Sequence, residues 1–328
     1  MKTIGLTFAS LGSLGVPAAP QLAGRAEALG YSSFWVAEAN GTESFGLLAA
    51  AGGAAPGLAL GSGVLPIQAR SPALAAMGAA TLQALWPDRD IILGVGLSAP
   101  GVAGRWHGAD GFDRPLARMR EYLTLVRELL SGEKVTFEGD FWTVRGFRLG
   151  VRLGDRRPRV ALAALNEGML RLGGELADVV LLNYLPASHV GWSVERIREG
   201  GDAEVHAYVH AAVTDWEAGA GAARKDLFGY AMAPGYARMF AAAGYADEMG
   251  AMDEAKAAGD RDAMVGAISD RMVQDIDFIG TADEVTAFVR TYADAGIDHP
   301  ILMPMPWGAD RRAVTEATMV AAAAPLDD

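Results

Sequence analysis

The stretch at residues 90–108, DIILGVGLSAPGVAGRWHG, decides how the rest of the chain is interpreted. It opens with the apolar run 91–97, and an apolar run of this length bounded by turn residues is typical of a strand buried on both faces. A glycine-rich loop that contains Trp106 and His107 follows. Because parallel strands in α/β proteins open onto loops that hold binding and catalytic groups, we expect a functional site after this strand.

Length and composition exclude several classes of protein. The chain has 328 residues, of which 51% are hydrophobic, so it can bury a large core. It has no cysteine, which excludes disulfides, thiolate metal sites and cysteine nucleophiles. The net charge of -12 argues against nucleic acid or an anionic membrane as a partner. Residues 1–10 lack the apolar core of a signal peptide, and no apolar run is long enough to span a bilayer, so we expect a cytoplasmic protein.

Apolar segments of strand length recur along the chain, and helical sequence follows each of them. The predicted strands are residues 4–10, 33–38, 58–65, 91–97, 160–165, 179–185, 205–213 and 300–305. This alternation predicts a parallel sheet covered by helices, and eight such units fit a (β/α)8 TIM barrel. An open doubly wound sheet is the alternative, but the first strand–helix turn lacks a GxGxxG fingerprint.

The predicted helices connect these strands within one domain, residues 1–328. They are residues 20–29, 44–51, 72–85, 114–130, 167–176, 193–199, 283–295 and 311–323. Two interruptions are interpreted as insertions into loops of the barrel. The first, about 131–158, contains a hairpin at 135–144 and a segment rich in Arg and Gly at 146–158. The second, about 215–277, is mostly helical.

The residues just past the strands of a TIM barrel share one face, the mouth. Here they are Phe8, Ser10, Glu38, Asn40, Gly63, Val64, Gln68, Ser98, Trp106, His107, Asn166, Asn183, Tyr184, His210, Thr214, Met303, Met305 and Trp307. The set is apolar and aromatic, with few charges. It therefore suits a flat conjugated ligand better than a metal ion or a highly charged sugar phosphate, and we expect no metal site.

Two members of this set are candidates for proton transfer, and two glycines are candidates for contact with a ligand. Glu38 is interpreted as an isolated carboxylate at the mouth, and His107 as a group on the loop above it. Either could instead be structural. Gly61 and Gly63 weaken a buried strand without a packing benefit, so they could let a flat ring lie against the backbone. A β-bulge is the alternative.

Several segments together resemble the bacterial luciferase-like flavin-dependent oxidoreductases, and in particular the branch that uses the deazaflavin coenzyme F420 in place of FMN. The most specific are LGSGVLPIQARSP at 60–72 and ILGVGLSAPGVAGRWHG at 92–108; FWVAEAN at 34–40 and the helix and hairpin at 114–142 are looser. The resemblance implies a barrel that binds the coenzyme at the carboxyl ends of its strands. It also implies a non-prolyl cis peptide at Gly63–Val64 that supports the ring.

The resemblance also assigns roles to individual residues. It implies that Glu38 and His107 are catalytic. The residues expected to bind the coenzyme are Asn40, Gly63, Val64, Gly96, Leu97, Ser98, Ala164, Asn166 and Gly168. The stretch 166–169 would receive the coenzyme phosphate at a helix start.

The functional hypothesis is hydride transfer between coenzyme F420 and an unidentified small organic substrate. The alternatives are an FMN-dependent monooxygenase and a non-catalytic binding barrel whose pocket is filled or is blocked by 146–158. A metal-dependent hydrolase would need more lumenal histidines and carboxylates than the chain supplies. The alanine-rich helix 72–85 could pack against a second copy, so we expect a homodimer.

Overall fold

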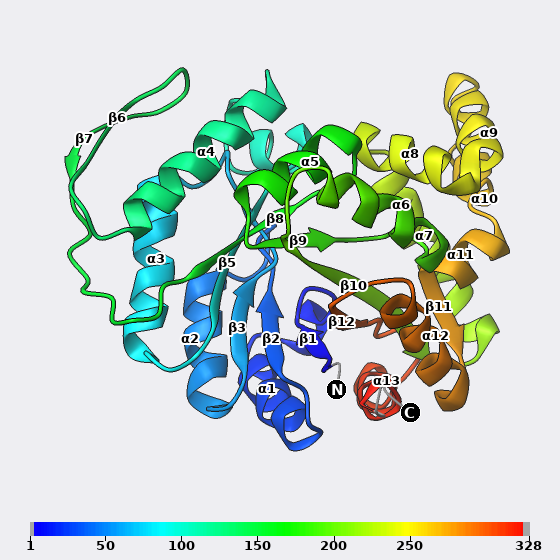
Figure 1. Ribbon diagram of the computed structural model, residues 1–328. Coiled ribbons are helices and arrows are strands. Elements are labelled where there is room, and N and C mark those ends of the chain that lie inside the picture. Colours follow the sequence, from blue (N-terminus) through cyan, green and yellow to red (C-terminus); the bar gives the residue numbers. More distant parts are fainter. Residues whose placement is uncertain (1–2, 324–328) are drawn as a thin grey trace.

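The computed structural model describes residues 3–323, and a closed barrel of parallel strands lies at its centre (Figure 1). The barrel strands are β1 (Gly5–Thr7), β2 (Ser33–Val36), β3 (Ala59–Ser62), β5 (Ile91–Gly96), β8 (Arg159–Ala163), β9 (Val179–Leu182), β10 (Glu204–Val213) and β12 (His299–Pro304). They pair in this order, and β12 pairs with β1 to close the ring. The predicted TIM barrel is therefore confirmed, and each predicted strand is a strand of the barrel.

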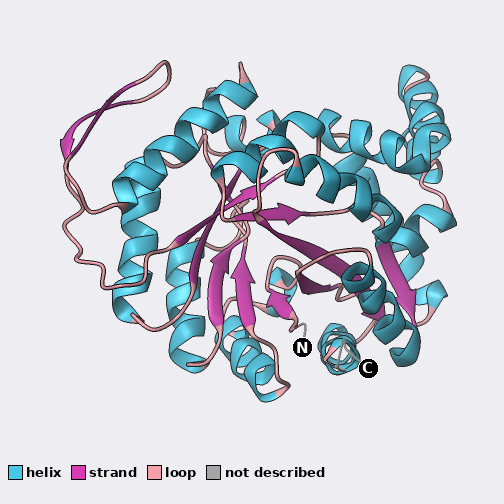
Figure 2. Cartoon of the chain, viewed as in Figure 1, coloured by secondary structure: helices cyan, strands magenta, loops and turns pink. Residues whose placement is uncertain are grey.

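Helices surround the barrel, as the cyan and magenta ribbons of Figure 2 show. They are α1 (Ala18–Ala28), α2 (Ser44–Ala54), α3 (Pro72–Leu85), α4 (Pro115–Leu130), α5 (Glu167–Leu176), α6 (Ala187–Arg198), α12 (Ala282–Asp294) and α13 (Arg311–Ala322). Short helical turns η1 (Gly12–Leu14) and η2 (Pro100–Gly104) lie in two loops at the mouth. Within residues 3–323, no helix combines the length and apolarity needed to cross a bilayer.

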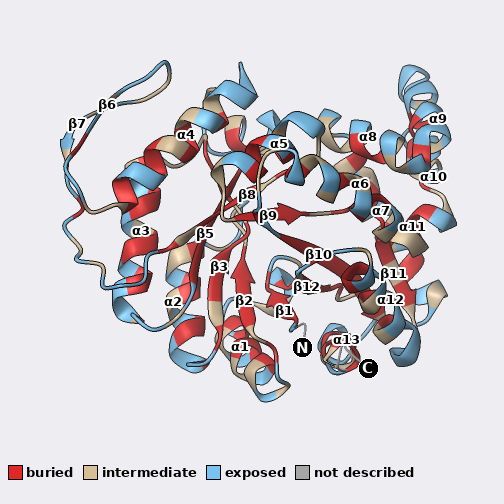
Figure 3. Ribbon diagram, in the orientation of Figure 1, coloured by how far each residue is buried: buried red, intermediate tan, exposed pale blue. Residues whose placement is uncertain are grey.

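The core has two parts, one between the strands and the helices and one inside the barrel. The second, which we call the lumen cluster, consists of Trp35, Ile92, Ala161, Val179, Leu181, Tyr208, Ala212, Ile301, Met303 and Met305. Val64 and Trp307 pack against it. Figure 3 shows the strands buried and the outer faces of the helices exposed. The interior of the barrel is thus filled by side chains, and ligands have access only at its ends.

Two elements differ from the prediction. Strand β11 (Asp277–Gly280) was not predicted; it runs parallel to the end of β10, with His210 opposite Asp277 and Val213 opposite Gly280. Helix α6 begins at Ala187, well before the predicted start at 193. In addition, the predicted third strand is divided, because β3 ends at Ser62 and the short β4 (Leu65–Pro66) pairs with β5.

The first insertion is a hairpin and an irregular segment. Strands β6 (Val135–Glu138) and β7 (Thr143–Phe147) are antiparallel, and the hairpin projects from the body of the molecule (Figure 1). In the segment that follows, Arg156 forms an ion pair of 2.6 Å with Asp90, which directly precedes β5. This part of the segment therefore lies at the amino-terminal end of the strands, opposite the mouth. A segment that blocked the pocket would have to lie at the mouth.

The second insertion contains a series of helices between β10 and β11. These are α7 (Trp216–Ala231), α8 (Pro234–Phe240), η3 (Ala241–Tyr245), α9 (Ala246–Ala257), α10 (Arg261–Gly266) and α11 (Asp270–Ile276). Because the chain leaves β10 at the mouth and returns to pair with the same strand, these helices begin and end beside the candidate site.

Candidate active site

The peptide after β3 is held between two other strands. The Gly63–Val64 bond is cis, as the resemblance implied. The Gly63 carbonyl accepts a hydrogen bond of 2.9 Å from Tyr208 Oη, and the Gly63 amide donates one of 2.8 Å to Val36 O. The amide of Glu38 donates to Val64 O at 3.3 Å. Tyr208 on β10 therefore fixes the carbonyl of Gly63, and the amide of Glu38, just after β2, fixes the carbonyl of Val64.

The glycines around this peptide serve packing, so the prediction that they have no packing benefit is wrong. A Cβ on Gly61 would lie 2.4 Å from the Trp35 ring, and one on Gly63 would lie 1.8 Å from Tyr208 Oη. Neither distance is possible for real atoms, since Cβ contacts shorter than 3.0 Å essentially never occur. Trp35 and Tyr208 of the lumen cluster thus fill the space that a side chain at either position would need.

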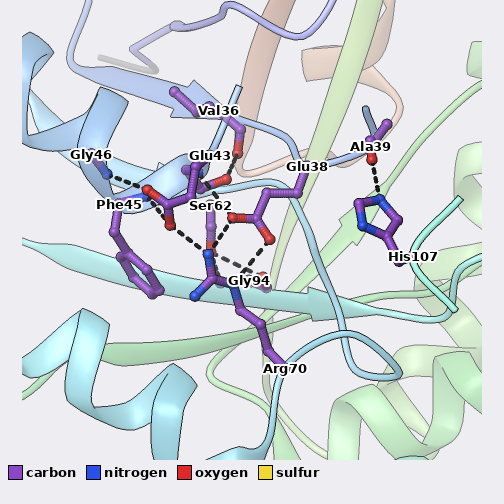
Figure 4. Close-up of polar contacts among 11 residues, drawn as sticks. Val36, Glu38, Ala39, Glu43, Phe45, Gly46, Ser62, Arg70, Gly94 and His107 are labelled. Carbon is purple, nitrogen blue, oxygen red and sulfur yellow. Dashed lines mark hydrogen bonds and ion pairs between the residues drawn. The ribbon is translucent and has the colours of Figure 1, made fainter. Parts of the chain in front are cut away.

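The neighbouring strand β5 approaches equally closely. Ser62 Oγ donates to Gly94 O and accepts from Gly94 N, each at 2.9 Å, and Figure 4 shows this contact behind the Glu38 side chain. A Cβ on Gly96 would lie 2.7 Å from Val64 Cγ2. Gly94 and Gly96 therefore leave room for Ser62 and Val64 to pack against β5.

Glu38 is paired, so its interpretation as an isolated carboxylate is wrong. The guanidinium of Arg70 binds both carboxylate oxygens, with Nη2 at 2.6 Å from Oε1 and Nε at 3.0 Å from Oε2 (Figure 4). The Ser44 amide donates to Oε1 at 3.0 Å. Arg70 also pairs with Glu43, whose side chain caps the start of α2. The hydrogen bond to Glu38 raises the pKa of Arg70. This pairing suits Glu38 to positioning better than to proton transfer.

A cavity of about 350 Å³, which we call the Glu38 cavity, brings three of the predicted residues together. It is lined by Glu38, Ala39, Asn40, Gly41, Thr42, Glu43, Pro66, Ala69, Arg70, Leu74 and His107. His107 comes from the loop after β5, and its Nε2 makes a hydrogen bond with Ala39 O (Figure 4). The predicted proximity of Glu38, Asn40 and His107 is thus present in the structure, although the sequence analysis did not include Arg70.

The predicted coenzyme residues after β5 lie beside this cavity and not in its lining. Leu97 is exposed, and Ser98 is joined to the loop after β4 by its amide, which donates to Gln68 Oε1 at 3.2 Å. Trp106 is exposed as well. These residues follow the carboxyl end of β5 and therefore belong to the mouth.

The predicted phosphate-binding residues lie at the start of α5. The side chain of Asn166, the residue before the helix, donates to Gly235 O at 3.1 Å and does not cap the helix. The first amide groups of α5 are therefore free to bind an anion. The negative charge of Glu167 opposes anion binding there, but Arg171 Nη2 forms an ion pair of 2.8 Å with Glu167 Oε1. Gly168 follows in the first turn. Ala164 is buried in the core.

A second cavity at the mouth, of about 330 Å³, contains two of the aromatic residues predicted there, Tyr184 and Trp307. It is lined by Ala9, Ser10, Ser13, Tyr184, Asp226, Tyr230, Met303, Met305, Pro306, Trp307 and Arg311. We call it the Asp226 cavity. Phe8, in contrast, is buried in the main core. Asp226 and Tyr230 come from α7 and were not predicted, because nothing in a helical insertion indicates which of its side chains return to the barrel.

A buried polar cluster lies directly behind the Asp226 cavity. Tyr184 Oη donates to Asp226 Oδ2 at 2.7 Å, and His210 contacts Asp277 Oδ1 through Nδ1 and Asn183 Oδ1 through Nε2, each at 2.9 Å. Burial raises the pKa of Asp226 to about 7, raises that of Asp277 well above its usual range and lowers that of His210 to about 4. A protonated Asp277 that donates to a neutral His210 agrees with the pKa directions of these two residues.

The amino-terminal end of the barrel also has cavities, and one of them, of about 720 Å³, is larger than either cavity at the mouth. It is lined by Arg127, Leu130, Arg157, Pro158, Arg159, Val160, Gly174, Ala177, Asp178, Asp202, Ala203 and Glu204. TIM-barrel active sites lie at the opposite, carboxyl-terminal face, so size alone does not make this cavity the candidate site.

The fold and the mouth together define a TIM-barrel enzyme with its site at the carboxyl ends of the strands. Residues 8–299 match the model of the luciferase-like monooxygenase family. The chain therefore belongs to the luciferase-like monooxygenase family and is an oxidoreductase of that class.

Individual relatives cover most of the chain. A Mycobacterium tuberculosis protein, provisionally named a coenzyme F420-dependent oxidoreductase, is 28% identical over 312 residues, which is 84% of this chain and 88% of its own. The 5,10-methylenetetrahydromethanopterin reductase of Methanolobus tindarius is 26% identical over 288 residues, 83% of this chain and 85% of its own. The solved structure of the coenzyme F420-dependent tetrahydromethanopterin reductase from Methanopyrus kandleri has the same fold, with a TM-score of 0.76, 20% identity and 97% coverage of both chains.

Proposed function

We propose that this protein transfers a hydride between coenzyme F420 and a small organic substrate. The observation that carries the proposal is the likeness over 84% of the chain to a relative named for this coenzyme. The open mouth of the barrel supports it, because two cavities there stand between loops that could enclose a flat ligand. When bound, the coenzyme would supply the hydride-transferring carbon.

The residues proposed to hold the coenzyme are those predicted from the sequence. They are Asn40, Gly63, Val64, Gly96, Leu97, Ser98, Ala164, Asn166 and Gly168. The backbone at the ends of β3 and β5 would contact the ring, and the free amides at the start of α5 would bind the phosphate. Ala164, whose side chain is buried, could contribute only through its backbone carbonyl.

The protein groups around the Glu38 cavity would position the ligand and exclude water. Arg70 fixes the Glu38 carboxylate, so Glu38 presents a rigid negative edge to the cavity. His107 is exposed at the rim, where it can exchange protons with solvent. We therefore assign positioning to Glu38 and proton exchange to His107.

A second candidate is an FMN-dependent monooxygenase, which the description of the matching family favours. The two coenzymes share a tricyclic ring but lead to different reactions, because a reduced flavin activates oxygen whereas a reduced deazaflavin transfers hydride. A homodimer is proposed as well: α3 exposes Leu74, Met77 and Leu85, and an apolar face of this kind suits an isologous contact. Light scattering during size-exclusion chromatography would measure the mass.

The coenzyme is tested by titrating the purified protein with F420 and, separately, with FMN while protein fluorescence is recorded. We expect saturable quenching by F420, and weaker binding after His107→Ala. Val320→Ala is the control, because Val320 lies in the last turn of α13, away from the mouth, and is 49% exposed. Quenching by FMN alone would establish the second candidate, and binding of neither coenzyme would overturn both.

A further inference from the structure

We propose that Asp226 is the proton donor of the Asp226 cavity, and that this cavity binds a neutral carbonyl compound or the corresponding alcohol. The inference rests on the hydride-transfer function proposed above, and it adds the substrate class and the acid. It assigns the Asp226 cavity to the substrate, and it leaves the Glu38 cavity and the start of α5 to the coenzyme.

The position of the Asp226 cavity suits a substrate. Met303 and Met305 line it and belong to the lumen cluster, which also contains Tyr208. Tyr208 holds the carbonyl of Gly63 at 2.9 Å, and Val64 packs against the same cluster. The cavity and the proposed ring-binding peptide therefore border the same packed group of side chains at the mouth of the barrel.

The lining of the cavity indicates a ligand with an apolar body and one polar end. Met303, Met305 and Trp307 supply the apolar wall. Asp226, the two tyrosines, two serines and Arg311 supply the polar wall, and the Tyr184 hydroxyl donates its only proton to Asp226 Oδ2 at 2.7 Å. A protonated Asp226 carboxyl is therefore a donor in this wall, and the ligand group that fits it is an uncharged oxygen acceptor.

The surroundings of Asp226 raise the pKa of its carboxyl to about 7. One ligand atom each of His210, Asp226 and Asp277 lies within 4.8 Å of the other two. Asp277 is fully buried, and its Oδ2 has no hydrogen-bond partner among residues 3–323. Burial of Asp226 against this cluster disfavours the charged form of its carboxyl. The charged or titratable groups that face Asp226 are Tyr184 after β9, His210 on β10, Asp277 on β11, Tyr230 on α7 and Arg311 on α13.

The proposed step is the two-electron reduction of a carbonyl group. The bound reduced deazaflavin would supply a hydride to the substrate carbon, and the electron pair of the carbon–oxygen π bond would move to the oxygen. The oxygen then takes the proton of the Asp226 carboxyl, which becomes a carboxylate. The substrate is reduced by two electrons to an alcohol, the coenzyme is oxidised by two electrons, and Asp226 regains a proton from water. In the reverse direction the Asp226 carboxylate accepts the alcohol proton.

The protonation of Asp226 is measured by infrared difference titration of the protein without coenzyme, labelled with ¹³C-aspartate, between about pH 5 and about pH 9. We expect a carboxyl band that disappears near the pKa of about 7, is missing in Asp226→Asn and is unchanged in Asp275→Asn. Asp275 is a matched control, because it also accepts a hydrogen bond from a tyrosine hydroxyl, at 2.8 Å from Tyr245, but does not line the cavity.

A second variant keeps the test valid if Asp226→Asn does not fold. The Tyr184 hydroxyl stabilises the Asp226 carboxylate, so Tyr184→Phe is expected to move the titration to higher pH. Three results would overturn the proposal: a band titrating near pH 7 that persists in Asp226→Asn, no band that titrates in this range, or complete loss of the titrating band on adding Zn²⁺ or Mg²⁺. The last result would identify the cluster as a cation site.

The ligand class is tested with cyclohexanone, whose binding to the wild-type protein is followed by ligand-observed NMR. Because a hydrogen bond from the carboxyl is lost on ionisation, we expect binding to weaken about tenfold between about pH 6 and about pH 9. Binding to Asp226→Asn is expected to be independent of pH. No binding, or the same pH dependence in both proteins, would overturn the assignment. Neither measurement uses F420, so failure of the coenzyme titration and failure of this proposal are separate results.

Discussion

The guanidinium of Arg70 binds the Glu38 carboxylate through two nitrogens, at 2.6 and 3.0 Å, and so joins the loop after β4 to the end of β2. Both side chains are largely buried, with exposures of 15% and 14%. A buried bidentate pair fixes geometry more firmly than an exposed one, because less water competes for its hydrogen bonds. The floor of the Glu38 cavity is therefore organised by an ion pair.

Removal of Arg70 is expected to destabilise the fold. Arg70→Ala leaves the Glu38 carboxylate partly buried without its counter-ion, so the free energy of unfolding should fall by about 2–3 kcal/mol. Arg120→Ala is the matched control, since Arg120 makes a bidentate pair with Glu175 that is about half exposed and should contribute less than about 1 kcal/mol. Urea unfolding measures both. Equal losses in the two variants would contradict the expectation.

A side chain at position 63 is expected to displace Tyr208. Gly63→Ala places a Cβ 1.8 Å from Tyr208 Oη, so we expect a loss of at least about 2 kcal/mol. Tyr208→Phe removes that atom, and the next ring atom lies 3.0 Å away, so the double variant should recover part of the loss. Gly53→Ala in α2 meets nothing within 4 Å and serves as the control. Thermal unfolding would show the rescue, and strictly additive losses would argue against this contact.

Asp226→Asn is expected to change the pH dependence of stability. The folded pKa of Asp226, about 7, is above the ordinary value of 3.8, so the stability that its proton contributes is complete in acid and is lost as the pH rises through 7. Asparagine does not ionise and has no such loss. The variant should therefore gain roughly 4 kcal/mol relative to wild type between about pH 4 and about pH 8. Urea unfolding at both values, with Asp275→Asn as control, gives the answer. A difference that does not vary with pH would contradict it.

Glu121 is expected to hold the hairpin of the first insertion. Its carboxylate accepts the amides of Asp140, Phe141 and Trp142 at 2.8, 2.9 and 2.7 Å. Glu121→Ala should therefore speed proteolysis within the hairpin several-fold while leaving the Tm nearly unchanged, because the barrel is not involved. Glu128→Ala, at an exposed position of the same helix, is the control. Cleavage at the same rate in both variants would show that the hairpin is held by other contacts.

Much of the fold could be predicted because its signals are local. Both ends of α3 were predicted: Pro72 suits a first turn, and Ser71 Oγ accepts from the Leu74 amide. Strand β11 was missed because its four residues contain only two apolar side chains and follow a long helical region. The early start of α6 was missed because its first turn has no clear apolar periodicity.

The candidate site was less predictable because its properties depend on partners distant in sequence. Glu38 and His107 were placed at the same cavity, which follows from the positions of their strands. Nothing in the sequence indicated that Arg70 would bind Glu38, since the two are separated by 32 residues. The same holds for Asp226 and Asp277, which meet His210 only because the chain returns to β10.

That return has a consequence for how the molecule can vary. The chain leaves β10 after Val213 and returns to the same strand at Asp277, opposite His210. The exit and entry points are therefore adjacent, and the intervening polypeptide can be lengthened, shortened or exchanged without altering the closure of the ring. Since Asp226 and Tyr230 reside in that interchangeable portion, a new ligand preference could be acquired by transplanting one segment onto an unchanged scaffold.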